Sequence, residues 1–467
     1  MSKLLVANRG EIACRIMRSA RELGLSTVAV YSAADRNSLH VELADEAVEI
    51  GPGPARESYL VKERIIEACR ATGATLVHPG YGFLAENADF ARMVESGGLT
   101  FVGPRPESIA RMGDKARARD AASKAGVPIL PGSGTFRGGR LEGIEEAAGR
   151  VGYPLLVKAS AGGGGIGMRR VDGADELIGI ASKTQELAER AFGDGTIYLE
   201  RYVPRARHVE VQVFGFGDGE AISLPERDCS IQRRFQKVIE ESPAPRISVE
   251  TRARLCSAAR DLARAVAYRG AGTVEFVMDA DSSEFYFLEM NTRIQVEHPV
   301  TEMVTGIDLV AMQLQLALGQ VSASDLREVG GPHGHAIECR IYAEDPARNF
   351  LPSPGRLDRF RMPLPSADVR VDTGIREGDV ISPFYDPMIA KLICRGKDRD
   401  AAVKAALHAL EEVHIAGVRT NTAYLSAVLA HPAFGAGDLH TSFLEEHADD
   451  LRAPPGTGAT SNTKAHA

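Results

Sequence analysis

Residues 285–299 read FYFLEMNTRIQVEHP, an apolar strand pattern that becomes strongly polar after residue 288. If the chain stays extended, the period of two places five polar side chains on one face: Glu289, Asn291, Arg293, Gln295 and Glu297. Glu275, in a neighbouring strand-like run, supplies a further carboxylate. Carboxylate and amide oxygens suit Mg²⁺, which keeps its other positions for water and substrate phosphates. The alternative is a solvated strand face with salt bridges, which leaves the apolar flanks unexplained.

A glycine loop forms the second candidate site. Residues 155–171 read LLVKASAGGGGIGMRRV, which predicts a strand, a loop over residues 162–167 and a second strand. Consecutive glycines let backbone N–H groups approach an anion closely, usually a phosphate. The loop lacks the Lys-Ser/Thr ending of a Walker motif, so a simple hairpin tip is the alternative. Lys158, at the end of the first strand, favours nucleotide binding because its ammonium group can contact a phosphate.

A charge-rich run covers residues 226–241, with the sequence ERDCSIQRRFQKVIEE. By itself, such a run is typical of a solvated surface. His208 is equally ambiguous, since a histidine in a strand is more often structural than catalytic.

The first hundred residues alternate strands and helices. We expect strands at residues 3–7, 27–31 and 75–77 and helices at residues 12–23 and 59–70, an arrangement that implies parallel pairing. The first turn, Asn8 to Glu11, contains no Gly-x-Gly-x-x-Gly motif and gives no support for a nicotinamide site. Alternating strands dominate residues 196–290, and a third region from about residue 333 mixes strands with a helix at 401–413. The sequence therefore predicts an α/β and α+β multi-domain protein.

Composition limits the partners. The chain has 467 residues, too many for a single core, and a formal charge of −8 that gives no support for nucleic-acid binding. No run approaches the ~18 apolar residues that a membrane span requires, and no signal peptide is evident, so we expect no membrane and a cytoplasmic location. The six cysteines are scattered without zinc spacing and are expected to be free.

Five segments together resemble the biotin carboxylase family of the ATP-grasp superfamily, over residues 4–444. They are ANRGEIA (7–13), HPGYGFL (78–84), ERDCSIQ (226–232), EMNTRIQVEHP (289–299) and FLPSPG (350–355). The resemblance implies an N-terminal Rossmann-like pre-ATP-grasp domain at 1–113 and an ATP-grasp domain at 114–330 with a mobile lid at about 131–203. It also implies a mixed α+β C-terminal biotin carboxylase domain at 331–446 and a disordered tail at 447–467.

The activity implied by this resemblance is a two-step carboxylation, in which ATP and bicarbonate form carboxyphosphate and the released CO₂ adds to N1′ of biotin. By motif match, the implied nucleotide contacts are Lys115, Lys158, Gly164, Gly165, Glu200, Val203, His208 and Gln232. The implied ligands of Mg²⁺ or Mn²⁺ are Glu275, Glu289 and Asn291. The implied bicarbonate site is Lys237, Arg293, Gln295 and Val296, with Glu297 as the base. Arg340 is implied to stabilise the biotin enolate.

Two positions depart from the family pattern: Ile166 replaces a residue that is usually cationic, and Phe235 replaces a histidine. An isoleucine at this position of the loop resembles the urea carboxylase branch, so a urea-like acceptor stays open. Because both departures replace polar contacts by apolar ones, a non-catalytic ATP-binding relative also stays open. ATP-dependent amide ligation on the same fold is a further alternative, disfavoured by the Glu297 and Arg340 matches. No Met-Lys-Met sequence occurs. We therefore expect a carrier protein or domain bearing biotin in trans, a carboxyltransferase subunit of an acyl-CoA carboxylase, and a homodimer.

Overall fold

The N-terminal part forms a five-stranded parallel sheet in the computed structural model, which describes residues 2–160, 167–326 and 331–451. The strands, in the order β3-β2-β1-β4-β5, are β1 (Lys3–Val6), β2 (Ser26–Ser32), β3 (Glu46–Gly51), β4 (Leu76–His78) and β5 (Thr100–Phe101). The helices are α1 (Gly10–Glu22), α2 (Leu39–Leu43), α3 (Lys62–Thr72), α4 (Ala88–Ser96) and α5 (Pro106–Gly113). The parallel sheet confirms the expected Rossmann-like arrangement.

The helix expected from residue 59 begins only at Lys62. Tyr59 precedes it and is fully buried, because its hydroxyl donates a 2.6 Å hydrogen bond to Asp35 and its ring stacks on Phe83. After α5 the chain turns at Asp114, whose carboxylate accepts the N–H of Arg117 and caps the next helix, α6 (Lys115–Lys124).

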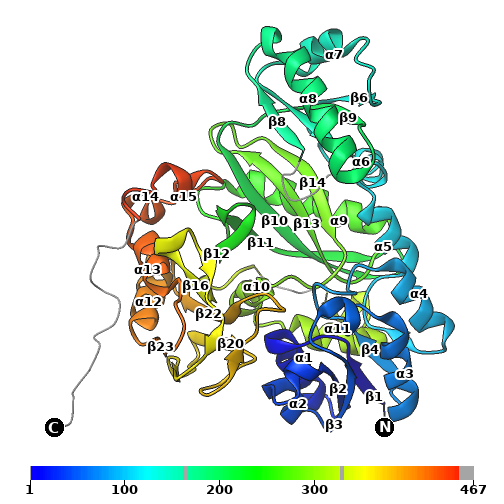
Figure 1. The fold of residues 1–467 in the computed structure, drawn as a ribbon, viewed down its shortest axis with the longest axis vertical. Coiled ribbons are helices and arrows are strands. Elements are labelled where there is room, and N and C mark those ends of the chain that lie inside the picture. Colours follow the sequence, from blue (N-terminus) through cyan, green and yellow to red (C-terminus); the bar gives the residue numbers. More distant parts are fainter. Residues whose placement is uncertain (1, 161–166, 327–330, 452–467) are drawn as a thin grey trace.

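A small four-stranded antiparallel sheet stands apart from the rest of the molecule (Figure 1). Its strands are β6 (Gly132–Phe136), β7 (Leu155–Ala159), β8 (Met168–Val171) and β9 (Ile197–Arg201), and α7 (Ile144–Val151) and α8 (Ala174–Phe192) cover it. The strands expected on either side of the glycine loop are present. The loop glycines 162–165 and Ile166 lie outside the described residues.

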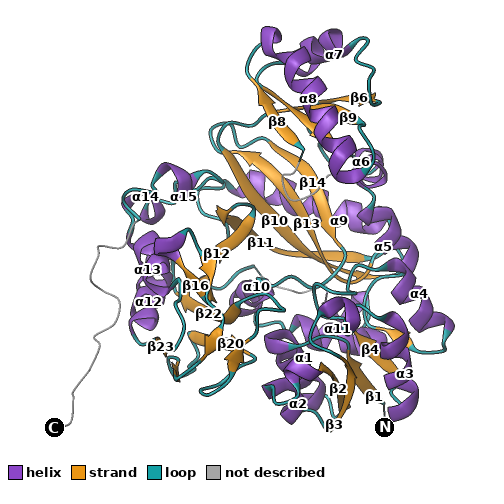
Figure 2. Ribbon diagram, in the orientation of Figure 1, coloured by secondary structure: helices purple, strands orange, loops and turns teal. Residues whose placement is uncertain are grey.

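An eight-stranded antiparallel sheet forms the centre of the molecule, in the order β14-β13-β10-β11-β12-β15-β22-β20 (Figure 2). The strands are β10 (Ala206–Phe216), β11 (Ala221–Arg233), β12 (Gln236–Ser242), β13 (Arg269–Asp279), β14 (Phe285–Asn291), β15 (His335–Tyr342), β20 (Val369–Thr373) and β22 (Met388–Gly396). The sheet continues across residue 330, since Ile239 of β12 pairs with Cys339 of β15. The central and C-terminal regions therefore share one sheet.

Helices cover both faces of this sheet. They are α9 (Val249–Ala265), α10 (His298–Thr305), α11 (Leu309–Ala317), α12 (Arg399–Glu411), α13 (Thr422–Ala430), α14 (Pro432–Gly435) and α15 (Phe443–Glu446). Short strands complete the C-terminal region: β16 (Glu344–Asp345), β17 (Leu351–Pro352), β18 (Gly355–Arg356), β19 (Arg359–Arg361), β21 (Val380–Ile381) and β23 (His414–Ala416). Within the described ranges, no helix has the length and apolar character needed to cross a membrane.

One expectation about exposure is wrong. The run at 226–241 is not a solvated surface, because it forms β11 and β12 inside the sheet, and Glu226, Arg227 and Asp228 are at most 1% exposed. Tertiary pairing supplies a partner for each charge, such as Arg207 for Asp228 at 2.7 Å. Of the tail expected at residues 447–467, the structure describes residues 447–451, in which the buried Leu451 packs into the C-terminal core, and residues 452–467 lie outside the described residues.

Candidate functional site

A cavity of about 780 Å³ lies between the small sheet and the central sheet. It collects fifteen of the side chains singled out from the sequence: Lys115, Lys158, Glu200, Val203, His208, Gln232, Lys237, Glu275, Glu289, Asn291, Arg293, Gln295, Val296, Glu297 and Arg340. Gly164 and Gly165 lie outside the described residues. Segments separated by more than 200 residues thus meet at one site.

Lys237 is the centre of the charge arrangement. Its Nζ donates to three carboxylates, at 2.6 Å to Glu210, 2.9 Å to Glu275 and 2.6 Å to Glu297. Burial alone would lower the pKa of Lys237, but the three carboxylates raise it well above its ordinary value. Lys237 is therefore a permanent positive charge at the floor of the cavity.

Glu297 lies between two cations. One oxygen accepts from Lys237, and the other is 3.0 Å from Nη2 of Arg340. Although burial alone would raise the pKa of Glu297, the charges of Lys237 and Arg340 hold it well below the ordinary value. Glu297 is consequently ionised. An anion that bound Lys237 or Arg340 in its place would raise the basicity of Glu297.

The segment after β14 does not continue as a strand. β14 ends at Asn291, and the chain then bends into α10, so the single extended face expected for residues 289–297 is wrong. Arg293 folds back and donates to Gln295 at 2.7 Å and to Asn291 at 3.2 Å. The bend aims these polar groups into the cavity. Behind it, the buried Lys391 donates to the Val296 carbonyl at 2.8 Å.

Glu275 and Glu289 lie directly opposite each other on β13 and β14. Burial and the negative charge of Glu275 raise the pKa of Glu289. A divalent cation between the two carboxylates would relieve this repulsion, and Asn291, whose amide oxygen is a further oxygen donor, lines the same cavity. This donor set fits a hard, oxygen-preferring metal such as Mg²⁺.

Several of the residues expected to contact the nucleotide lie within hydrogen-bond distance of one another in pairs. Lys158 donates to Glu200 at 2.6 Å, and Nε2 of Gln232 is 2.8 Å from Nδ1 of His208. The other ring nitrogen of His208 lies 3.1 Å from Glu275. Lys115 and Val203 line the same cavity. The cations expected to contact phosphate therefore share a cavity with the candidate metal ligands.

Two residues of the site were missed from the sequence. Glu210 is fully buried and bridges Lys237 and Arg227, and the alternation of its strand gave a weak signal for an inward position. Glu86 accepts from Nε of Arg293 at 2.9 Å. It lies in a loop some 200 residues away, and no sequence pattern connects it to Arg293.

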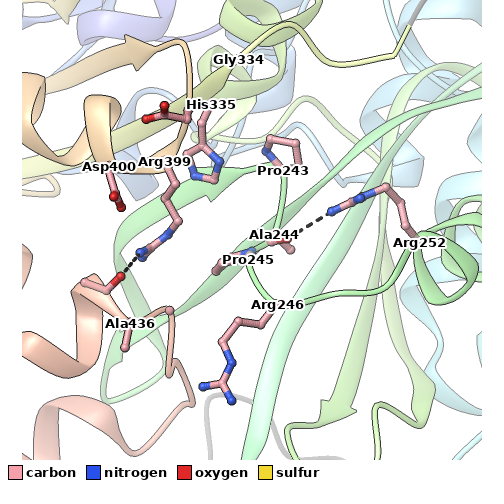
Figure 3. A pocket seen from close by; sticks show the side chains of 13 residues that line it. Pro243, Ala244, Pro245, Arg246, Arg252, Gly334, His335, Arg399, Asp400 and Ala436 are labelled. Atoms are coloured by element: carbon pink, nitrogen blue, oxygen red, sulfur yellow. Dashed lines mark hydrogen bonds between the residues drawn. The ribbon is translucent and has the colours of Figure 1, made fainter.

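Two other cavities differ in their position relative to the site. A cavity of about 500 Å³ joins the site, sharing Arg293, Val296 and Arg340 with it. A remote pocket of about 420 Å³ is shown in Figure 3, where Arg252 and Arg399 donate to backbone carbonyls. These arginines also pair with Glu226 and Glu241, so the charges of both guanidinium groups are already balanced.

Comparison with known proteins agrees with this geometry. Residues 1–109 match the biotin carboxylase N-terminal domain, 114–324 the carbamoyl-phosphate synthase L chain ATP-binding domain, and 338–446 the biotin carboxylase C-terminal domain. The chain is 49% identical to biotin carboxylase 1 of Bacillus subtilis, over 96% of this chain and 99% of that protein. The structure also superposes on a crystal structure of the biotin carboxylase domain of 2-oxoglutarate carboxylase from Hydrogenobacter thermophilus, in complex with MgADP and bicarbonate. The TM-score is 0.88 at 43% sequence identity, and the superposition covers 97% of this chain and 99% of that one.

The chain therefore belongs to the biotin carboxylase family, the ATP-dependent ligases built on this ATP-grasp fold. It is also 48% identical, over 97% of its length, to the mitochondrial methylcrotonoyl-CoA carboxylase subunit alpha of Dictyostelium discoideum. It spans 64% of that relative and 61–63% of the corresponding subunits of other organisms.

Proposed function

We propose that the chain carboxylates N1′ of biotin on a carrier protein, using ATP and bicarbonate through carboxyphosphate. The observation that carries this proposal is the buried Lys237 ammonium, bound to three carboxylates beside Arg293 and Arg340 in one cavity. Joining bicarbonate to a triphosphate brings two anions together. A site that holds several fixed cations out of bulk water lowers this repulsion more than solvent does.

The bicarbonate step follows from the charges. Bicarbonate bound to Lys237 and Arg293 would compete with Glu297 for Lys237, so the basicity of Glu297 would rise when the substrate arrives. Glu297 then takes the bicarbonate proton, the bicarbonate oxygen attacks the γ-phosphorus, and the bond to the ADP oxygen breaks. The side chains of Gln295 and Arg293 orient the anion.

Mg²⁺ or Mn²⁺, held by Glu275, Glu289 and Asn291, would screen the phosphate charge. Lys115 and Lys158 would contact the phosphates, with Gly164 and Gly165 as backbone donors. His208, Gln232, Glu200 and Val203 would contact the rest of the nucleotide. Closure of the small sheet (residues 132–201) over the cavity would exclude water from carboxyphosphate.

Arg340 connects both cavities, which suits an entry path for biotin through the 500 Å³ cavity. Carboxyphosphate would break down to CO₂ and phosphate, and the phosphate would take the N1′ proton, which places negative charge on the ureido oxygen of biotin. Arg340 is the cation proposed to stabilise that charge, and CO₂ released next to it then adds to N1′.

Beyond the catalytic step, we propose that the chain is a subunit of an acyl-CoA carboxylase of fatty-acid biosynthesis, with a biotin carrier and a carboxyltransferase as partners. The likeness to methylcrotonoyl-CoA carboxylase alpha subunits supports a branched acyl-CoA as acceptor. We also retain as proposals the homodimer, the cytoplasmic location and the boundaries at residues 113, 330 and 446. The free cysteines suit a reducing compartment.

A nucleotide-binding relative without turnover is the second candidate. Phe235 lines the cavity and is 64% exposed, and its ring supplies no hydrogen bond to a nucleotide. A urea-like acceptor is the remaining alternative for the second half of the reaction.

The test is ATP hydrolysis by the purified chain with Mg²⁺. We expect turnover that requires bicarbonate and increases with free biotin, and the absence of both effects would reject the proposal. Lys237→Ala should lower bicarbonate-dependent turnover by about 10²-fold or more, while calorimetry finds ATP affinity changed only a few-fold. Lys183→Ala, an exposed lysine of α8, is the control and should leave turnover unchanged.

A further inference from the structure

Two buried acids face each other beside Arg340. Glu240 of β12 and Glu338 of β15 are directly opposite in the antiparallel register, and both are fully buried. Directly opposite residues have their Cβ atoms about 4.5–5.5 Å apart, so the two carboxyl groups are neighbours. Among the described residues, neither oxygen of Glu338 has a hydrogen-bond partner. Two negative charges in this arrangement would be strongly unfavourable.

The nearby cations are already engaged. Arg340 forms ion pairs with both Glu240 and Glu297. Lys391, opposite Arg340 on β22, binds the Val296 carbonyl and lies 3.2 Å from Glu11. The charged or titratable groups around the pair are Lys237, Arg340, Lys391, Glu297, Cys229, Cys339 and Tyr342. None of these cations is left to neutralise a second carboxylate.

We propose that Glu240 and Glu338 share one proton at neutral pH and thereby leave the charge of Arg340 available to the biotin enolate. This inference rests on the proposed function. Burial raises the pKa of Glu240 to about 7 despite the opposing charge of Arg340, and burial raises that of Glu338 well above its ordinary value. Both acids are positioning residues, because they act through Arg340.

The charge balance explains why a proton is useful here. With Glu240, Glu338 and Glu297 all ionised, three negative charges act on Arg340, and an approaching enolate would be repelled. With one proton on the pair, the two acids together carry one negative charge instead of two, and Arg340 stabilises the enolate better. Raising the pH removes the proton, so biotin-dependent turnover should fall on the alkaline side. No bond other than the O–H of the pair changes.

The experiment uses the full chain with MgATP and saturating bicarbonate, comparing turnover with and without free biotin from pH 6 to 9. Glu338→Gln leaves Glu240 as the single acid at this position, so a second negative charge cannot form and the alkaline decline should flatten. Glu240→Gln leaves Glu338 as the single acid and should flatten the decline for the same reason. Bicarbonate-dependent hydrolysis without biotin should keep its pH profile in both variants.

Glu241→Gln is the matched control. Glu241 is the next residue on β12 and is buried, but it points to the other face, where Arg399 and His335 hold it ionised. This variant should lower stability without moving the alkaline decline. An equal loss of activity at every pH in Glu240→Gln and Glu338→Gln would overturn the proposal.

Infrared spectroscopy gives a readout independent of activity. A carbonyl stretch of a protonated carboxyl group is expected at neutral pH and should disappear in Glu338→Gln but not in Glu241→Gln. Its absence from the parent protein would overturn the inference. A parent without biotin stimulation would instead reject the proposed function, and the spectrum would still report on the pair.

Discussion

The two faces of strands β12, β15, β22 and β20 are opposite in character. On one face, Ile337, Cys339 and Leu392 pack against α12 in an apolar core. On the other face, the same strands present acids and bases, covered by α1 and α10: Glu240, Glu338, Arg340, Lys391, Asp372 and Arg370. One sheet thus combines a conventional core with a buried charged layer.

The charged face is ordered by ion pairs that join distant segments. Arg370 binds Asp372 and Glu302, each at 2.7 Å, and Glu302 also binds Arg15 of α1 at 2.9 Å. Burying such groups costs desolvation energy, so this face adds less stability than apolar packing would. It fixes positions instead, because Lys391 and Arg340 reach the catalytic segment from here. The comparison indicates that stability and function are divided between the two faces.

A substitution that removes a cation from the charged face should have the largest effect on stability and on KM for bicarbonate. Lys391→Met leaves Glu11 and Asp372 without this cation and removes the donor to the Val296 carbonyl. Losing one partner of a buried ionic group costs about 3–5 kcal/mol. Denaturant titration should show this loss, and KM for bicarbonate should rise. Lys397→Met, at an exposed position just after the same strand, is the control. An unchanged KM would contradict the positioning role of Lys391.

Breaking the apolar face should cost stability alone. Leu392 is 1% exposed in the core under α12. Leu392→Ala should lower the free energy of unfolding by about 2–5 kcal/mol, because the buried side chain leaves a cavity. At a temperature where the variant is folded, KM for bicarbonate should match the parent value. A shift in KM comparable to that of Lys391→Met would show that the two faces are not separable.

Lowering the pH should destabilise the charged face through His298, with the smallest effect of the three. His298 of α10 is fully buried, and burial together with Lys391 and Arg15 lowers its pKa well below 6.5. The unfolded chain therefore binds a proton below about pH 6.5 that the folded chain does not, and stability falls as pH falls. Between pH 7.5 and 5.5 this histidine costs about 1.4 kcal/mol. His298→Gln should remove that part of the pH slope in denaturant titrations, whereas Leu392→Ala should keep the full slope.

Much of the site could be predicted because its chemistry lies in short segments. The polar stretch after residue 288 and Lys158 beside the glycine loop carry their signals locally, and all fifteen described candidates line one cavity. Glu86 could not be found, since only folding brings its loop to Arg293. The burial of residues 226–228 was missed for the same reason: charged strands enter a core only when partners from other segments neutralise them.

The order of strands and helices and the type of chemistry follow from local sequence, because backbone periodicity and functional groups are local properties. The continuation of the central sheet past residue 330 and the bend after Asn291 depend on long-range packing. The pairing of Glu240 with Glu338 depends on it as well. Strand register and charge neutralisation depend on groups far apart in the chain, and no local pattern encodes which of them will meet.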